Sequence, residues 1–154
     1  MKGHPRAGQP TYFVEKFYNS LFHKNNLMDY PNGLFVDDSI KEKKHNTIRM
    51  GRHFKPLDEL TLAVWTGKPY RSKQIKLWTG PIRAVDIVIQ VRLYNSIKVC
   101  KVIPKGNRYT LDSINKIELA KNDGLSLEDF ISWFKLPIGD HDAQILIWNP
   151  EINY

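Results

Sequence analysis

The sequence feature that most constrains the fold is a regular alternation of apolar side chains between residues 85 and 93. Every second position is apolar, namely Val85, Ile87, Ile89, Val91 and Leu93. Asp86, Gln90 and Arg92 fall between them. Because successive side chains of a strand point to opposite faces, this period of two predicts one long strand with a single buried face. The fold must therefore contain a sheet.

Shorter segments with the same period predict the partners of this strand. Strands are expected at 60–65, 74–78, 97–103 and 144–148, and Pro150 should end the last of them. A turn is expected at 56–59, before the first of these strands.

Helical spacing predicts three helices. The first should begin at Thr11, because Phe13, Phe17 and Leu21 recur at every fourth position after it. Asp112 is expected to cap a second helix that ends before Gly124. Ser126 and Asp129 form a partial capping box for a third helix over 127–134. Strands with helices at their edges predict an α+β fold with a small, strongly twisted sheet or barrel.

The length of 154 residues suits one domain. A hydrophobic share of 42% and a charged share of 25% are ordinary for a soluble protein and argue against disorder. We find no apolar run near the roughly 20 residues that a membrane span needs and no signal-peptide core, so the expected location is cytoplasmic. Cys100 lies in an apolar run and is expected to be a packed thiol. His45 and His53 have no zinc-like spacing, so no metal or cofactor is expected.

The positive charge is concentrated in the middle of the chain. Residues 41 to 108 carry sixteen basic and four acidic side chains, whereas residues 109 to 154 carry three basic and eight acidic ones. A basic region of this kind favours a polyanionic partner, because binding phosphates releases condensed counterions. Solubility alone would also explain a basic surface, so nucleic-acid or nucleotide binding stays one of two interpretations.

The segment Lys44-His45-Asn46-Thr47-Ile48-Arg49 places an amine, a hydroxyl and a guanidinium close together. On a helical turn or across a tight loop, Lys44 would be near enough to take a proton from Thr47 if burial lowered its basicity. Arg49, on an expected strand, has the planar fork that holds a phosphate or carboxylate. The alternative is that this common spacing is solvated surface.

Together with later residues, this segment resembles the ASCH domain, a branch of the PUA-like superfamily. The resemblance rests on Lys44 to Arg49, the turn and strand at 55–60, and the stretch 120–126 that leads to Phe130 and 133–134. It covers roughly residues 35 to 149 and implies a small PUA-like β-barrel with flanking helices. It also implies that the chain divides into an N-terminal helical extension at 1–34 and an ASCH domain at 35–154, and that the domain binds RNA or modified nucleosides.

Some small ASCH proteins remove the acetyl group from N4-acetylcytidine, and the resemblance implies matching roles in this chain. Lys44 would be the proton acceptor, Thr47 the nucleophile, and Asp123 would occupy the position of the family's proton-donating Glu. An Asp is one methylene shorter, and a misplacement of about 1 Å can cost on the order of a hundredfold in rate. Without the resemblance, Asp123-Gly124 is interpreted as a helix end with a left-handed Gly cap.

The connection from Thr66 to Arg83 is a second departure from the small ASCH enzymes, since it is longer and holds five basic residues and no acidic one. In one interpretation Tyr70 stacks on a base while Lys68, Arg71 and Lys73 meet phosphates. In the other, this is a soluble hairpin with Tyr70 packed on its own strand.

Three functions follow from these observations. The first is binding of RNA or a modified nucleoside in a basic cleft lined by Lys44, Thr47 and Arg49, with Arg52 and the basic connection contributing. The second is an amidohydrolase acting on acylated cytidine. The third is a protein interaction module whose aromatic N-terminal helix is the partner surface.

Overall fold

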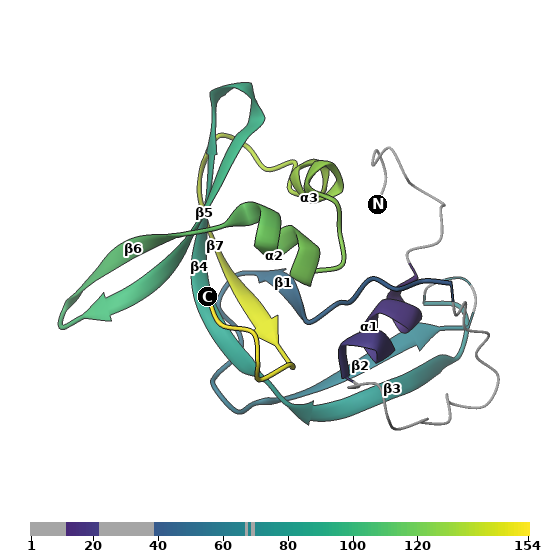
Figure 1. Ribbon diagram of the computed structural model, residues 1–154. Helices are drawn as coiled ribbons and strands as arrows, with labels where there is room; N and C mark the ends of the chain where they lie inside the picture. The colour runs from purple at the N-terminus through teal and green to yellow at the C-terminus, as the bar shows by residue number, and fades with distance from the viewer. Residues whose placement is uncertain (1–11, 22–38, 67, 69) are drawn as a thin grey trace.

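The computed structural model describes residues 12–21, 39–66, 68 and 70–154. A five-stranded antiparallel sheet forms its larger part (Figure 1). Its strands are β1 (Asn46–Met50), β4 (Arg83–Arg92), β5 (Ser96–Lys105), β6 (Arg108–Ile114) and β7 (Gly139–Ile147). They lie in the order β1-β7-β4-β5-β6, so the last strand in the sequence pairs with the first and the alternating strand β4 is central.

A second, two-stranded antiparallel sheet is made by β2 (Glu59–Trp65) and β3 (Gln74–Pro81). Only Ile82 separates β3 from β4, so the chain passes directly from the small sheet to the large one (Figure 1). Ile82 is buried and exchanges backbone hydrogen bonds with Leu57 and Asp58, which ties the expected turn at 56–59 to this junction.

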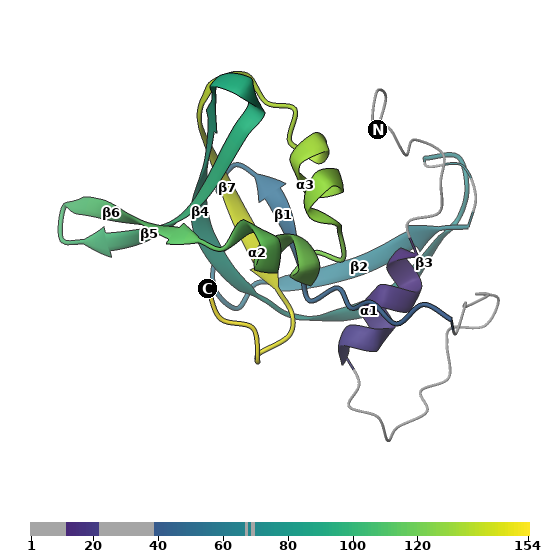
Figure 2. The ribbon, with the colours of Figure 1, turned by 45° about the horizontal axis from the view of Figure 1, so that its top comes forward.

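The main core lies between the large sheet and the helices α2 (Lys116–Asn122) and α3 (Leu127–Trp133). Both helices lie on the same side of the sheet (Figures 1 and 2). Ile87 and Ile89 of β4 belong to the same core cluster as Leu119 of α2 and Phe130 of α3, and all four are fully buried. Burying a side chain of this size stabilises the fold by about 1.5–3 kcal/mol, so the alternation in β4 directly produces the core.

Helix α1 (Phe13–Leu21) packs on a separate aromatic cluster at the small sheet. The ring of Phe17 lies 6.3 Å from that of Trp78 on β3 and 5.6 Å from that of Trp148, centroid to centroid. Trp148 follows β7 directly, so this cluster connects the helix to both sheets.

The structure confirms the expected α+β class and most expected elements. The strands expected at 60–65, 74–78 and 97–103 form, and β7 is longer than expected, starting at Gly139. Helix α3 begins after Ser126, whose hydroxyl accepts a hydrogen bond from the backbone N–H of Asp129, as the capping box predicted. The thiol of Cys100 is buried, as expected.

The prediction of a helix capped by Asp112 is wrong. Residues 108–114 form β6, which pairs with β5 through a tight loop at Gly106, and Asp112 lies opposite Lys101. The helix starts later because the side chain of Asn115 accepts from the backbone N–H groups of Ile117 and Glu118.

The end of β4 also differs from its expected position. Leu93, expected on the buried face, lies instead in the short 3-10 helix η1 (Leu93–Asn95) and is 67% exposed. The chain turns back there into β5, and Leu93 is not part of the main core.

The hydrogen-bonded sheets of the described residues do not close on each other, so a PUA-like barrel stays a prediction. The Thr11 cap and the domain limit at residue 34 lie outside the described residues. In the part of the chain that the structure describes, no helix has the length and apolar character to cross a membrane.

Candidate functional site

The two sequence motifs meet in a pocket of about 210 Å³ between α1, the start of β1 and the connection from α2 to α3. Its lining comprises three predicted catalytic residues, one predicted ligand residue and their neighbours: Phe13, Lys16, Lys44, Thr47, Ile48, Arg49, Asp123, Gly124, Leu125, Trp133 and Phe134. The structure therefore brings Lys44, Thr47, Arg49 and Asp123 together.

Lys44 and Asp123 form a buried ion pair at the base of this pocket. The ammonium of Lys44 contacts the Oδ1 atom of Asp123 and also donates to the backbone oxygen of Asp123 at 2.7 Å. The two side chains are only 11% and 10% exposed. Two of the three ammonium hydrogens are thus directed to Asp123, while the ring of Phe13 lies 5.8 Å from the nitrogen.

Backbone hydrogen bonds hold the segment before β1 between two helices. The N–H of Lys44 donates to the carbonyl of Lys16 on α1, and the N–H of His45 donates to the carbonyl of Asn122 at the end of α2. Residues 40–45 form no helix, so the helical turn considered for Lys44 is wrong. An extended segment exposes its N–H groups to neighbouring elements, which explains why it can be fixed between α1 and α2.

Gly124 permits this close approach. It has a φ of +72°, the left-handed conformation expected for a helix-ending Gly. A Cβ atom added to it would lie 3.2 Å from Cδ of Lys16 and 3.3 Å from Cβ of Lys44. The structural interpretation of Asp123-Gly124 as a helix end is therefore confirmed, and the same Gly leaves space for two pocket lysines.

Burial shifts both members of the ion pair toward their neutral forms. Loss of hydration lowers the pKa of Lys44, with Asp123 opposing this shift and the charges of Arg49 and Lys16 adding to it. Loss of hydration also raises the pKa of Asp123, against the effect of Lys44 and Arg49. The pair is thus suited to exchange a proton, because a desolvated amine becomes a weaker base and a desolvated carboxyl a weaker acid.

Thr47 and Arg49 have their polar groups available to a ligand. Thr47 is 8% exposed, and its hydroxyl has no hydrogen-bond partner among the described residues. Arg49 is exposed on β1, and no carboxylate of the described residues pairs with it. A small ligand entering the pocket would meet a free hydroxyl and a free guanidinium.

The pocket has residues that sequence reasoning did not assign to it. Lys16 donates to the carbonyl of Gly124 at 2.8 Å, and Phe13, Trp133 and Phe134 add aromatic surface. Trp133 is 48% exposed at the pocket. The helical period of α1 predicted that Phe13 is buried, but nothing local indicated which segment would lie against it.

The remaining predicted ligand residues lie outside the pocket. Arg52 forms an exposed ion pair with Asp142 at 2.8 Å. Lys68, Tyr70, Arg71 and Lys73 belong to the connection between β2 and β3. Tyr70 is 89% exposed, yet its ring centroid lies 5.3 Å from that of Trp65 at the end of β2. This tyrosine is therefore both exposed and in contact with the preceding strand.

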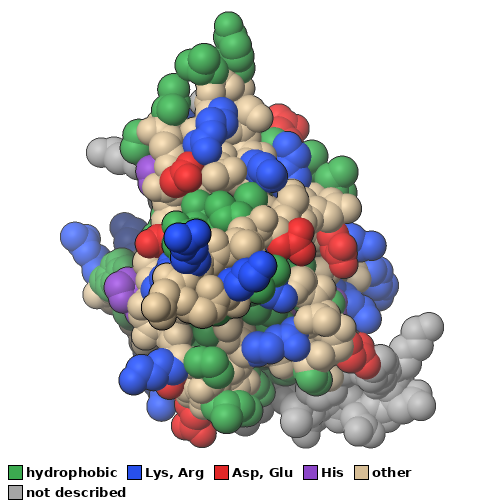
Figure 3. Space-filling view, turned by 90° about the vertical axis from the view of Figure 1, so that its left-hand side faces the viewer, with side chains coloured by type: hydrophobic (Ala, Val, Ile, Leu, Met, Phe, Trp, Pro, Cys, Tyr) green, Lys and Arg blue, Asp and Glu red, His purple; other side chains and the backbone are tan. Residues whose placement is uncertain are grey.

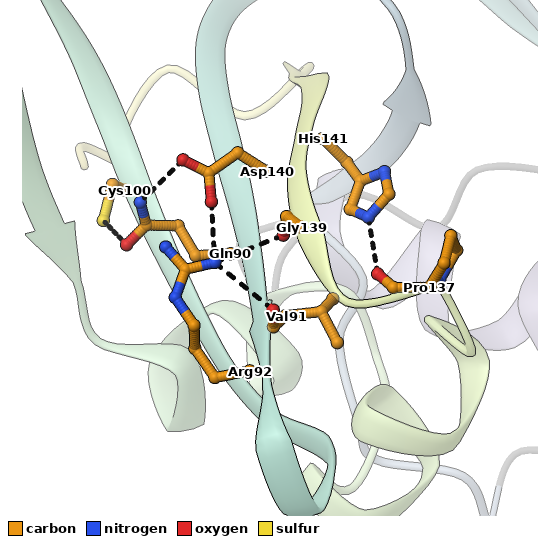
Figure 4. A network of polar contacts seen from close by, with 8 residues as sticks. All are labelled: Gln90, Val91, Arg92, Cys100, Pro137, Gly139, Asp140 and His141. Carbon is orange, nitrogen blue, oxygen red and sulfur yellow. Dashed lines mark hydrogen bonds and ion pairs between the residues drawn. The ribbon is translucent and has the colours of Figure 1, made fainter.

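Lys and Arg side chains are also spread over the face that carries β5 and β6 (Figure 3). A separate polar network joins the ends of β4 and β7 nearby (Figure 4). Asp140 accepts from Arg92 at 2.7 Å and from Gln90 at 3.1 Å, and these bonds lower its pKa. The side chains of Gln90, Arg92 and Asp140 are hydrogen-bonded to one another, which is consistent with a structural role.

The aromatic residues of α1 considered as a partner surface face the chain itself. Phe17 is 0% and Tyr18 is 5% exposed, and both pack on the cluster around Trp78 and Trp148. Within the described ranges, no group of three or more His, Cys, Asp or Glu side chains lies close enough together to hold a metal ion.

Comparison with known proteins gave no match for this chain among protein-family models, curated protein sequences or solved structures. The candidate site is therefore defined by the geometry of the residues described above.

Proposed function

We propose that this pocket binds the base of a modified nucleoside in RNA, with the chain acting as an ASCH domain of the PUA-like type. The observation that carries the proposal is the meeting of two motifs. Lys44 and Asp123 are 79 positions apart in the sequence and form a buried ion pair beside Thr47 and Arg49. Separate surface motifs would have no reason to meet in one pocket.

The chemistry of the lining fits a base. Phe13 and Trp133 offer aromatic surface, on which an unstacked base can pack, and a stacking contact of this kind contributes about 1–3 kcal/mol. Thr47 and the Lys44–Asp123 pair offer hydrogen-bonding groups to its polar edge. The volume of about 210 Å³ lies below the usual range for drug-sized ligands and limits the ligand to a small group such as a single base.

Binding of N4-acetylcytidine, free and within a short single-stranded RNA, tests this function. Titration calorimetry should show binding to wild type and a loss of about fivefold or more for Arg49→Ala or Trp133→Ala. Arg52→Ala is the matched control, because it removes an arginine that lies outside the pocket and is paired with Asp142. An equal loss in Arg52→Ala, or no binding by wild type, would contradict the proposal.

A second candidate, amide hydrolysis at an acylated cytidine, is favoured by the free Thr47 hydroxyl beside the shifted Lys44–Asp123 pair. Starting from the neutral form of the pair, in which the proton lies on Asp123, the Thr47 oxygen would form a bond to the acetyl carbon while its proton passes to the Lys44 amine. The bond between that carbon and the N4 nitrogen then breaks, and Asp123 in its protonated form supplies a proton to the departing amine. Water finally hydrolyses the acetyl ester on Thr47.

Turnover assays distinguish this candidate from binding alone. If Thr47 is the nucleophile, Thr47→Val, which keeps the shape and removes the hydroxyl, should abolish cytidine release yet still bind N4-acetylcytidine. Lys44→Ala serves as the second variant. Equal background turnover in wild type, Thr47→Val and Lys44→Ala would exclude the hydrolase and leave the binding function unaffected.

A further inference from the structure

The outer halves of β5 and β6 form a ribbon that projects from the body of the protein (Figures 1 and 2). The pairing of β4 with β5 ends at Lys101, opposite Ile87. Beyond that point residues 102–105 and 108–111 pair only with each other. Every residue from Ile103 to Ser113 is exposed. A two-stranded ribbon is only marginally stable in water by itself. A partner that covers this ribbon would therefore stabilise it.

The charge of the ribbon identifies the kind of partner. Residues 102 to 111 carry two basic side chains, Lys105 and Arg108, and no acidic one, and Asp112 follows where β6 lies opposite Lys101. Lys105 and Arg108 lie opposite each other at the tip, on either side of a tight loop whose Gly106 has a φ of +60°. Neither side chain has an ion-pair partner among the described residues. Their positive charges are therefore free to meet phosphates.

The two faces of the ribbon differ in chemistry. Directly opposed residues share a face, and successive pairs alternate between faces. Lys105, Arg108 and Thr110 lie on one face, while Pro104, Tyr109 and Leu111 lie on the other. Tyr109 is 61% exposed next to the charged tip. The two cations and the exposed ring thus lie on opposite faces of the ribbon close to its tip. A single strand that passes around the tip would meet the cations with its phosphates and the ring with one base, which are the two kinds of contact that single-stranded nucleic acid makes.

We propose that the β5–β6 ribbon is a second RNA contact, in which Lys105 and Arg108 bind the phosphate backbone and Tyr109 stacks on an unpaired base. This inference rests on the proposed function and makes its substrate class narrower. The substrate is a base within an RNA strand, which reaches from the pocket to the ribbon, instead of a free nucleoside. A second copy of this chain is a poorer occupant, because two identical tips would bring like charges together.

Fluorescence anisotropy with a labelled single-stranded RNA of about 12 nucleotides, measured over a series of salt concentrations, tests the ribbon. The slope of log affinity against log salt is negative, and Lys105→Ala/Arg108→Ala should reduce its magnitude by about 1.4, since each phosphate contact to a single strand contributes about 0.7. Tyr109→Ala should weaken binding by about tenfold with an unchanged slope.

Two controls make the result specific. Lys105→Arg/Arg108→Lys keeps both charges and should keep the wild-type slope. Binding of free N4-acetylcytidine should be the same in wild type and in all ribbon variants, because the ribbon lies outside the pocket. Thermal unfolding should be unchanged, since the substituted side chains are exposed.

The experiments distinguish a wrong proposal for the ribbon contact from a wrong proposal for the pocket function. RNA binding with an unchanged slope in Lys105→Ala/Arg108→Ala overturns the ribbon contact while the pocket function stands. If wild type binds no RNA but binds free N4-acetylcytidine, the ribbon contact is again overturned. A wild-type dimer that these substitutions convert to monomer in sedimentation experiments would assign the ribbon to a second copy and also overturn the proposal.

Discussion

At the scale of single residues, the Lys44–Asp123 pair is the most informative feature of this protein. A buried ion pair is weak evidence for stability, because the loss of hydration can exceed the attraction between the charges. Removing one partner is nevertheless costly, since it leaves the other charge buried and alone. The pair therefore has effects on stability that can be separated from any role in binding or catalysis.

Substitution of Lys44 tests the burial of this pair. Lys44→Met should lower the free energy of unfolding by about 3–5 kcal/mol at neutral pH, and Lys44→Met/Asp123→Asn should recover a large part of the loss. Urea denaturation measures both. The matched control is Arg52→Met, which breaks the exposed pair with Asp142 and should cost less than about 1 kcal/mol. Similar losses in Arg52→Met and Lys44→Met would contradict a buried pair.

The stability of Lys44→Met should depend on pH because the pKa of Asp123 is raised. Burial raises the pKa of Asp123 above its unfolded value of 3.8, and Lys44→Met removes the cation that opposes this rise. Above pH 3.8 the folded variant then binds a proton that the unfolded chain does not, so its stability increases as pH falls through the folded pKa. The cost of Lys44→Met should thus shrink from neutral pH toward acid. In Lys44→Met/Asp123→Asn this trend should be absent.

At the scale of elements, the periodicity of the sequence located most strands, and the errors have identifiable causes. The alternation at 85–91 and the capping box at Ser126 are local signals, and both elements formed where they were expected. The expected helix began after Asp112, because Asp is a good cap residue, whereas residues 113 and 114 belong to β6. The Gly106-Asn107 pair between β-favouring residues was the hairpin signal that would have corrected it.

The corrected start of α2 can be tested with two matched alanine substitutions. Asn115→Ala removes the side chain that accepts from Ile117 and Glu118, so it should destabilise the protein by about 1 kcal/mol. Asp112→Ala changes an exposed position of β6 and should stay within about 0.5 kcal/mol of wild type. Chemical denaturation of both variants measures the difference. A larger loss of stability in Asp112→Ala than in Asn115→Ala would instead favour a helix that begins directly after Asp112.

At the scale of the whole molecule, the packing of α1 determines whether the pocket is complete. The helix contributes Phe13 and Lys16 to the pocket and is attached through Phe17, which is fully buried among Trp78 and Trp148. The site thus depends on an aromatic cluster that lies between the small sheet and the end of β7. A change in this cluster should affect both stability and ligand binding.

Phe17→Ala tests this dependence. The cavity should cost about 3–5 kcal/mol, and tryptophan fluorescence should change because Trp78 and Trp148 lose their neighbour. Binding of N4-acetylcytidine should weaken under conditions where the variant is still folded. Leu57→Ala, at a residue that is 81% exposed, is the control and should change neither property. Unaltered ligand binding by folded Phe17→Ala would show that α1 is not needed for the pocket.

The sequence by itself determined the α+β class, most strands, the third helix and the identity of the residues with reactive groups. These follow from the period of apolar side chains and from capping residues, which act over a few neighbouring positions. Only the tertiary structure decided that Lys44 and Asp123 pair, that Lys16 and Trp133 join them, and that Arg52 and the basic connection lie elsewhere. The physical reason is that contacts between distant residues depend on the path of the chain and on which charges become buried together, and neither is a local property of the sequence.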